Sequence, residues 1–428
     1  MTATIETGAP AAGAAHEGEV PKPFGLSSYS HLLHFPERPE SAQTSGAVDA
    51  IIVPTVRSAQ QLSSAVDLAS QLRCELIALY TDRLPDGLSS VLAKLKPGSA
   101  TEVALSSDPE RRELDLGPVI SQRWPSDCAT DISRKRNLGL LIGRACGWTR
   151  MLFLDDDIRR INAEKVRPAA ALIDRYPVVG LQVKKYPDAS VVRHARRLTG
   201  HYSQPFISGG SLLVDPQRLR GFFPAVYHED WLCLIDNLRL GEVAIGGTVG
   251  QLRYRPFTTP DRAKLEEFGD ILASGLLWLL HAVGKKSAEP SAVSRKYWQP
   301  ATKALFWDHV LIQRNELLGN TVELLNRSTV HDTDAALESV KASWERCVAL
   351  SSREFVTFVA DWLDGLDAWQ ARLARVPPAG SVKQALADLG LRREVQPEPD
   401  HPRPRAAAAR QKLASLLARR RERLSRSE

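Results

Sequence analysis

The segment from residue 48 to residue 82 places a helix-like stretch between two strand-like ones, and this order constrains the fold more than any other feature. "VDAIIVPTV" (48–56) and "CELIALYTD" (74–82) are short apolar runs, and buried strands have this pattern. Between them, four apolar residues recur at helical spacing: Leu62, Val66, Ala69 and Leu72. A strand, a helix and a strand in this order predict a parallel sheet that is covered by helices.

Similar signals recur further along the chain. Strand candidates lie at 150–157, 178–183, 209–215 and 241–255, and helix candidates lie at 131–147 and 229–240. Beyond about residue 290 only helical patterns remain. In that region five large apolar residues alternate in steps of four and three, as on one packed helix face: Phe355, Val359, Trp362, Leu366 and Trp369. We interpret this stripe as core packing rather than as an aromatic ligand site.

Composition divides the chain into four parts. Residues 1–45 are rich in Ala, Gly, Pro, Ser and Glu without periodicity, and we expect them to form a disordered leader. Residues 46–290 are expected to form the α/β domain and residues 291–376 a helical C-terminal domain. Residues 377–428 are expected to form a linker and a basic helical tail.

The net charge of +6 is concentrated in the tail. Residues 401–428 hold nine Lys and Arg against two Glu, which is +7 and leaves −1 for the rest of the chain. A folded body without an excess of positive charge is not suited to grip nucleic acid, so we expect no nucleic-acid partner. For the tail, a solvated extension is the simpler interpretation, and peripheral contact with an acidic partner or an anionic membrane is the alternative.

The cysteines and the apolar runs bear on location. The five cysteines are scattered and form no C-x-x-C pair, which indicates neither a disulfide framework nor a zinc site. The longest apolar run, "ILASGLLWLL" (271–280), falls well short of the roughly 20 residues that a membrane span needs. The N-terminus also lacks the pattern of a secretory signal. We therefore expect a cytoplasmic protein without a transmembrane segment.

The strand candidate "RMLFLDDD" ends in three consecutive acids, Asp155, Asp156 and Asp157. Since successive side chains of a strand point to opposite faces, Asp155 and Asp157 are expected on one side and Asp156 on the other. Ligands bind at the carboxyl ends of the strands in open α/β sheets. Carboxylate oxygens suit Mg²⁺ or Mn²⁺, and a cation that bridges to a diphosphate would relieve the repulsion between the acids. The simpler alternative is a strand that ends in polar, capping residues.

The order of these motifs resembles that of glycosyltransferases with the GT-A fold, especially the family 2 type. The matching elements cover about residues 48–255 and read "IIVPTVRSAQQL", "ALYTD", "RKRNLGLLIGRA", "FLDDD", "ISGGSLLVD" and "HEDW". The resemblance implies an α/β fold with a Rossmann-like mixed sheet flanked by helices, here with an all-helical C-terminal extension. It also implies transfer of a single sugar from a nucleoside-diphosphate sugar to an acceptor hydroxyl. Neither the acceptor nor the oligomeric state follows from it.

The resemblance assigns roles by position. Asp155 and Asp157 match the metal-binding acids of the family, and Mn²⁺ or Mg²⁺ is the implied cofactor. The residues implied to contact the donor nucleotide are Thr55, Arg57, Asp82, Arg136, Asn137 and Asp156. Arg136 could equally be a solvated helix residue. His281 is a weaker candidate for a metal ligand, because a lone His on an apolar segment is more often a packing residue.

Asp230 matches the general base of the inverting members, and Glu229 lies beside it as the second catalytic candidate. An acceptor hydroxyl is a poor nucleophile at neutral pH, and a carboxylate can remove its proton as the new bond forms. The metal in turn would stabilise charge on the departing diphosphate. The alternative is that both acids merely open a helix, where they favour the N-terminal dipole.

Three other functions fit less well. A phosphatase of the haloacid dehalogenase type needs Thr or Val at the fifth position of its D-x-D motif, where this chain has Arg159. A nucleotidyltransferase usually needs a Gly-rich loop after the first strand, and "PTVRSAQQL" lacks it. A processive polysaccharide synthase would carry a Q-x-x-R-W motif, which does not follow the Glu-Asp pair. A nucleotide-binding scaffold that keeps the fold without turnover remains the alternative from another class.

Overall fold

The computed structural model describes residues 32–36, 46–96, 98–107, 127–185, 189–201, 206–253, 255–283, 295–330 and 333–391. Contacts divide the chain into a unit at 1–391 and a unit at 392–428. Every element below belongs to the first unit. The predicted basic helical tail lies outside the described residues, and so does most of the predicted leader.

Within the described ranges, eight strands form one sheet: β1 (Ala50–Pro54), β2 (Glu75–Thr81), β3 (Ala100–Leu105), β4 (Met151–Leu154), β5 (Ile158–Arg159), β6 (Val178–Lys185), β7 (Ser211–Val214) and β8 (Val243–Gln251). Their order across the sheet is β3-β2-β1-β4-β7-β6-β8-β5. β7 runs antiparallel to β4 and β6, and β5 runs antiparallel to β8, whereas the other neighbours are parallel. The predicted mixed sheet is confirmed.

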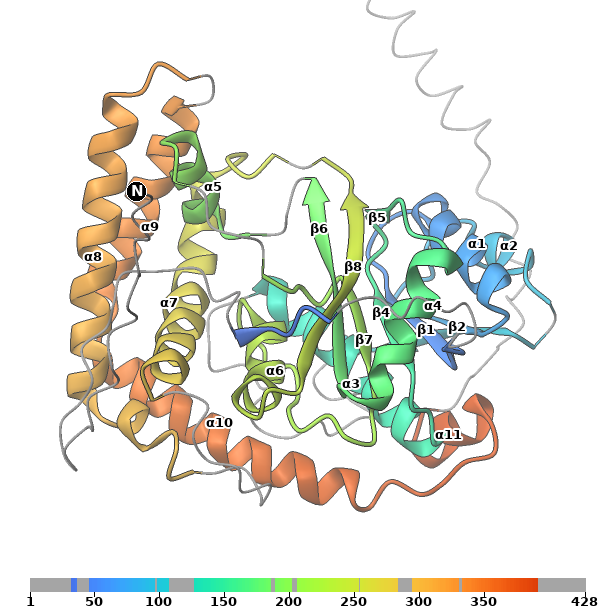
Figure 1. Ribbon diagram of the computed structural model, residues 1–428. Helices are drawn as coiled ribbons and strands as arrows, with labels where there is room; N and C mark the ends of the chain where they lie inside the picture. Colours follow the sequence, from blue (N-terminus) through green and yellow to red (C-terminus); the bar gives the residue numbers. More distant parts are fainter. Residues whose placement is uncertain are drawn as a thin grey trace, which may run out of the picture. The chain divides into compact units, whose positions relative to one another are not determined.

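Helices flank the sheet and dominate the C-terminal part of the first unit (Figure 1). The α-helices are α1 (Ser63–Leu72), α2 (Leu88–Leu92), α3 (Asp127–Ala145), α4 (Ala163–Ala171), α5 (Val191–Leu198), α6 (Glu229–Arg239), α7 (Pro260–Val283), α8 (Ala304–Asn326), α9 (Thr333–Ala349), α10 (Ser352–Leu373) and α11 (Val382–Asp388). Short 3-10 turns occur at Ala59–Leu62, Leu172–Asp174 and Gln299–Thr302. The helical region beyond residue 290 confirms the predicted extension, and the helix-only part begins with α7.

Alternation along the strands divides the core into two layers. In β4, Met151 and Phe153 face the layer that holds α3, α6 and the C-terminal helices, and Leu152 and Leu154 face the layer that holds α1, α2 and α4. All four side chains are fully buried, which explains the apolar run in the sequence. Asp155 continues the alternation of Phe153, so it faces α3 and α6.

The C-terminal helices pack against each other and against the sheet domain. Figure 1 shows α8 and α9 side by side, and α9 also contacts α7 and α5. The predicted stripe from Phe355 to Trp369 is confirmed, since all five of its residues are buried on α10. Buried ion pairs join two of these helices: Arg314 of α8 donates to Glu267 and Asp270 of α7 at 2.6 to 2.8 Å. Replacing only one partner of a buried ion pair lowers the stability of the fold strongly, because the other charge stays buried and unpaired.

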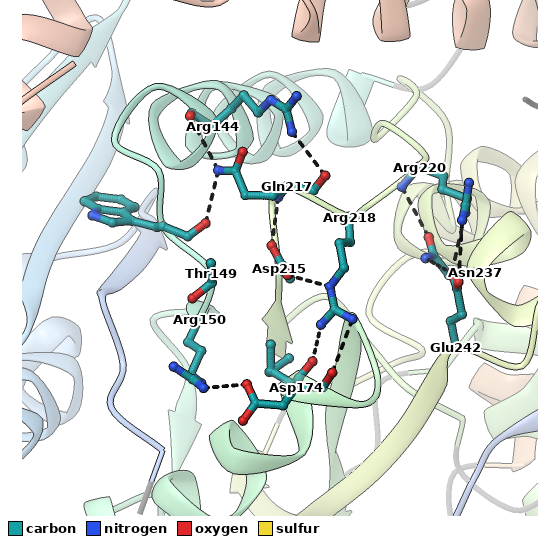
Figure 2. Close-up of polar contacts among 12 residues, drawn as sticks. Arg144, Thr149, Arg150, Asp174, Asp215, Gln217, Arg218, Arg220, Asn237 and Glu242 are labelled. Carbon is teal, nitrogen blue, oxygen red and sulfur yellow. Dashed lines mark hydrogen bonds and ion pairs between the residues drawn. The ribbon is translucent and has the colours of Figure 1, made fainter. Parts of the chain in front are cut away.

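Polar contacts hold the end of the sheet where β4 begins (Figure 2). Gln217, after β7, donates from Nε2 to the carbonyl of Trp148 at 3.1 Å. Asp215 accepts from the backbone N–H of Gln217 at 2.9 Å and from Nε of Arg218 at 2.6 Å. Since β7 runs antiparallel to β4, these contacts fix the start of β4 and leave its other end for the acidic residues.

Two segments differ from the predicted boundaries. Residues 32–36 fall within the predicted leader, but Leu32 and Leu33 are buried and His34 forms a parallel bridge to Ala244. Two backbone hydrogen bonds, from His34 to Val243 and from Ile245 to His34, hold this segment beside β8. At the other end, α11 forms within the predicted linker and packs on α3. In both cases buried apolar side chains supply the order that local composition does not indicate.

Candidate active site

The acidic cluster lies where two parallel strands end side by side. β1 pairs with β4, so the residues that follow β1 meet those that follow β4. Thr55 donates from Oγ1 to Asp156 at 3.3 Å, and Arg57 forms an ion pair with the same carboxylate. Arg57 also reaches Oδ2 of Asp157 at 3.2 Å. The predicted proximity of these residues is therefore present.

Arg136 of α3 joins the strand end to the Glu-Asp pair. Its Nη2 donates to both oxygens of Asp155 at 2.9 and 3.1 Å, and its Nη1 donates to Glu229 at 2.5 Å. The guanidinium is 2% exposed and lies over the ring of Phe223 at 5.6 Å. Arg136 is thus a buried bridge between two acids and not a solvated helix residue.

The Gly-Gly pair before β7 makes room for this bridge. A Cβ on Gly209 would lie 2.4 Å from Nη1 of Arg136, and a Cβ on Gly210 would lie 2.8 Å from Oδ2 of Asp155. Any larger residue would displace the guanidinium or the carboxylate. The small residues in "ISGGSLLVD" therefore serve the site and not the strand alone.

Arginines lie beside the three aspartates and reduce the repulsion between them. Asp155 pairs with Arg136, and Arg57 pairs with Asp156 and Asp157. The role of Asp155 and Asp157 as metal ligands stays a prediction.

Asp157 nevertheless has a carboxylate oxygen that nothing satisfies. Its Oδ1 is buried and has no hydrogen-bond partner among the residues that the structure describes, while its Oδ2 accepts from Gln251 at 3.2 Å. Burial and the charge of Asp155 raise the pKa of Asp157. A buried carboxylate with an open oxygen is suited to a cation. Among the described residues, no three His, Cys, Asp or Glu side chains form a metal site, but Mg²⁺ needs one or two carboxylates when substrate phosphates supply the rest.

Glu229 and Asp230 occupy the first turn of α6, where Asp230 is buried and Glu229 is partly buried. Burial, and next the charge of Asp230, raise the pKa of Glu229 to about 8, against the opposing charge of Arg136. Asp230 accepts from the backbone N–H of Gly209 at 2.7 Å and from that of Trp231 at 2.8 Å. These N–H groups orient its carboxylate, as the position of a general base requires.

His228 holds the start of α6 in an unusual conformation. Its φ of 66° lies in the left-handed region, which few residues other than glycine adopt. Its ring is 3.1 Å from Asp270 through Nε2 and stacks on Trp231 with a centroid distance of 4.1 Å. Strain of this kind persists where the surrounding contacts over-determine it, and it is common next to active sites.

Two cavities adjoin the cluster. One of about 240 Å³ is lined by the three aspartates, Arg57, Gln251 and Arg262, together with Asp131 and Lys135 of α3. The other, of about 390 Å³, lies against the ends of β1 and β2 and includes Thr55, Tyr80 and Thr81 in its lining. Arg57, Asp131 and Lys135 line both cavities, so these can hold parts of one ligand.

Asp131 and Lys135 are site residues that the sequence analysis missed. Lys135 is 1% exposed and donates from Nζ to the carbonyl of Thr55 at 2.9 Å and to Asp131 at 2.6 Å. Asp131 also accepts from the hydroxyl of Thr81. The sequence signal was a charged pair four residues apart at a helix start, which is interpreted first as capping and surface pairing.

Six predicted residues line neither cavity: Arg136, Glu229 and Asp230, which are described above, and Asp82, Asn137 and His281. Asp82 is on the surface, with a positive φ of 55°, and accepts from the backbone N–H of Ser107 at 2.8 Å. Asn137 is fully buried and bonds the backbone N–H and carbonyl of Phe223 at 2.9 and 2.8 Å. His281 is exposed in the last turn of α7. None of them is among the residues that line either cavity.

No protein-family model matches the chain, and no curated protein matches it in sequence. Among solved structures, it is similar to TarS of S. aureus, with 13% identity over 75% of this chain and 55% of that one, at a TM-score of 0.31. It is also similar to the mannosyltransferase Ktr4p of S. cerevisiae in complex with GDP, with 12% identity over 49% of this chain and 68% of that one, at a TM-score of 0.25.

The chain therefore spans little more than half the length of TarS. Ktr4p is named a mannosyltransferase, and glycosyltransferases are the class that the sequence motifs resemble. Superpositions this loose carry no argument about the fold family, donor, acceptor or reaction of this chain.

Proposed function

We propose that the protein is a metal-dependent glycosyltransferase that moves one sugar from a nucleoside-diphosphate sugar to an acceptor hydroxyl, with inversion at the anomeric carbon. The observation that carries this proposal is the unsatisfied buried Oδ1 of Asp157, in a carboxylate that lines a cavity together with Asp155 and Arg57. An open carboxylate oxygen suits a cation, and a guanidinium suits a phosphate.

In this proposal each of the two adjoining cavities holds one part of the donor. Mn²⁺ or Mg²⁺ would be held by Asp155 and Asp157 and would supply stabilisation of the charge on the departing diphosphate. Arg57, which is 48% exposed, would turn part of its charge toward the phosphates. The second cavity would receive the nucleoside, with Thr81 and Asp131 at its edge as hydrogen-bonding groups.

Asp230 is the proposed general base. Its carboxylate is oriented by two backbone N–H groups, and Arg136 ties its neighbour Glu229 to Asp155. Through this bridge the base and the acids proposed to bind the metal belong to one rigid cluster. Proton removal from the acceptor requires such a fixed relation between base and leaving group.

The test is a screen of nucleotide sugars for slow hydrolysis and for thermal stabilisation, with and without Mn²⁺. We expect one donor to raise the melting temperature and to be hydrolysed only with the metal. Asp157→Asn should lose both effects, while Asp82→Asn, an exposed control that lines neither cavity, should keep them. Hydrolysis that proceeds equally in the Asp157→Asn variant would refute the assignment of the metal site.

One observation favours a second candidate, a nucleotide-binding scaffold without turnover. Every aspartate of the cluster already has an arginine partner, so the three carboxylates lie together without a bound cation. The same screen separates the two: a scaffold binds a nucleotide equally well with and without metal and hydrolyses no donor.

A cytoplasmic location fits either candidate. The four cysteines that the structure describes are unpaired, as in a reducing compartment. Among the described residues, no helix combines the length and the apolar character that crossing a membrane requires.

A further inference from the structure

A third cavity lies outside the candidate active site, where α5, α7 and α8 meet. Its volume is about 270 Å³, close to the lower end of the range of roughly 300 to 1,000 Å³ for small-molecule sites. It shares no lining residue with the two cavities at the acidic cluster. Nothing in the proposed transfer reaction uses it.

One end of this cavity is positively charged. Arg196 of α5 lines it, is partly buried, and forms no ion pair among the described residues. Burial, and next the charges of Arg314 and Arg193, lower the pKa of Arg196. The cation of Arg314 is already matched by Glu267 and Asp270. Arg196 is therefore a cation that lacks its anion.

The other walls are apolar. Ile271, Trp278, Val310 and Leu317 contribute apolar surface. The carboxylate in the lining, Glu316, is exposed on α8.

We propose that this cavity binds a small amphipathic anion, with a carboxylate or phosphate head near Arg196 and a short apolar body between α7 and α8. The anion pairs with the guanidinium of Arg196, and the apolar walls cover the rest of the ligand. Charge and apolar surface in one cavity define this chemistry together, and neither alone would.

The test uses octanoate and octyl phosphate as probes, with octanol and inorganic phosphate as partial ones. Isothermal titration of the full chain should show saturable binding of at least one amphipathic anion and much weaker binding of octanol and phosphate. Which head group binds better distinguishes a carboxylate ligand from a phosphate ligand. Binding of octanol as tight as that of octanoate would overturn the proposal.

Variants assign the binding to this cavity. Arg196→Gln should weaken binding about tenfold, because it removes a charge-assisted hydrogen bond. Arg353→Gln is the matched control: it removes the same charge from an exposed position on α10 and should change nothing. Asn320→Trp, at an exposed lining position, should block the cavity and abolish binding without disturbing the core. Arg314 is unsuited to this test, since it also holds Asp270.

Unchanged affinity in both Arg196→Gln and Asn320→Trp would refute the proposal. A melting curve of each variant without ligand shows whether it is folded. The outcome is independent of the proposed transfer reaction, because binding is measured without donor or metal.

Discussion

Replacement of Arg136 by Met should destabilise the protein more than any exposed charge change, because the buried Arg136 is the cation that the partly buried Asp155 and Glu229 share. Three hydrogen bonds are lost, at 2.5, 2.9 and 3.1 Å, and two partly buried carboxyl groups lose the cation that they share. Removing one partner of a buried ion pair typically costs about 3–5 kcal/mol.

The expected shift in melting temperature follows from the size of the unit. At about 2.1 cal/mol/K per residue, the entropy of unfolding for the unit at 1–391 is about 0.8 kcal/mol/K. The loss therefore corresponds to a fall of about 4–6 °C, measurable by differential scanning calorimetry. Arg295→Met is the control, because Arg295 pairs only with exposed carboxylates of Asp364 and Asp367 and such pairs contribute about 0–1 kcal/mol.

The size of the effect should depend on pH. Arg136 lowers the pKa of Glu229, so its removal raises that pKa further above about 8. The variant then continues to lose stability at alkaline pH, where the wild type no longer does. Adding Glu229→Gln to the variant should recover part of the loss, as expected for coupled neighbours. A fall of less than 1 °C for Arg136→Met would refute the bridge between the two acids.

Three further predictions test the site. Asp157→Asn should fold at least as stably as the wild type, because burial and the charge of Asp155 raise the pKa of this carboxyl. Metal-dependent nucleotide binding by the variant should be weaker by tenfold or more in a titration, and binding equal to that of the wild type would contradict the prediction. The wild type should lose stability between pH 4.5 and about 8, because a carboxyl whose pKa is raised in the folded state stabilises most below its unfolded pKa, and Glu229→Gln should flatten this loss. Denaturant titrations at pH 5, 7 and 9 check this, and the same pH dependence of stability in variant and wild type would count against it. Gly209→Ala should cost about 1–3 kcal/mol in chemical denaturation and lower donor hydrolysis, because its Cβ would lie 2.4 Å from Arg136; an unaffected variant would mean that the guanidinium moves freely.

The sequence predicted the strands whose buried residues form a continuous apolar run. β1, β2 and β4 are continuous apolar runs, since both of their faces are covered by helices. β3 was missed because two of its six residues are buried, Val103 and Leu105, so its pattern is weak. β5 was missed because it consists of two residues that pair with β8, far away in the chain. Such pairing depends on tertiary structure and leaves no local signal.

The sequence predicted which strand ends meet, but it did not predict how the side chains there pair. Asp155, Asp156, Asp157, Thr55 and Arg57 meet because parallel strands end together, and that follows from the strand order. The pairing of the aspartates with arginines did not follow, because Arg57 and Asp156 are 99 residues apart.

Neighbours on one helix can also have unlike roles. Arg136 and Asn137 were predicted to serve the same ligand, but consecutive helix positions point about 100° apart. Arg136 therefore reaches Asp155, and Asn137 turns into the core and bonds the backbone of Phe223. The same geometry explains why Lys135 and Asp131, one turn apart, lie together beside Thr55 and Thr81.

The most direct test of the whole account is a calorimetric titration of the wild-type chain with nucleoside diphosphates, performed with Mn²⁺ and again with a chelator. The account predicts that at least one diphosphate binds more than tenfold tighter with Mn²⁺, because the open oxygen of Asp157 and the diphosphate share the ion. Equal affinity under both conditions, or no binding under either, would contradict it.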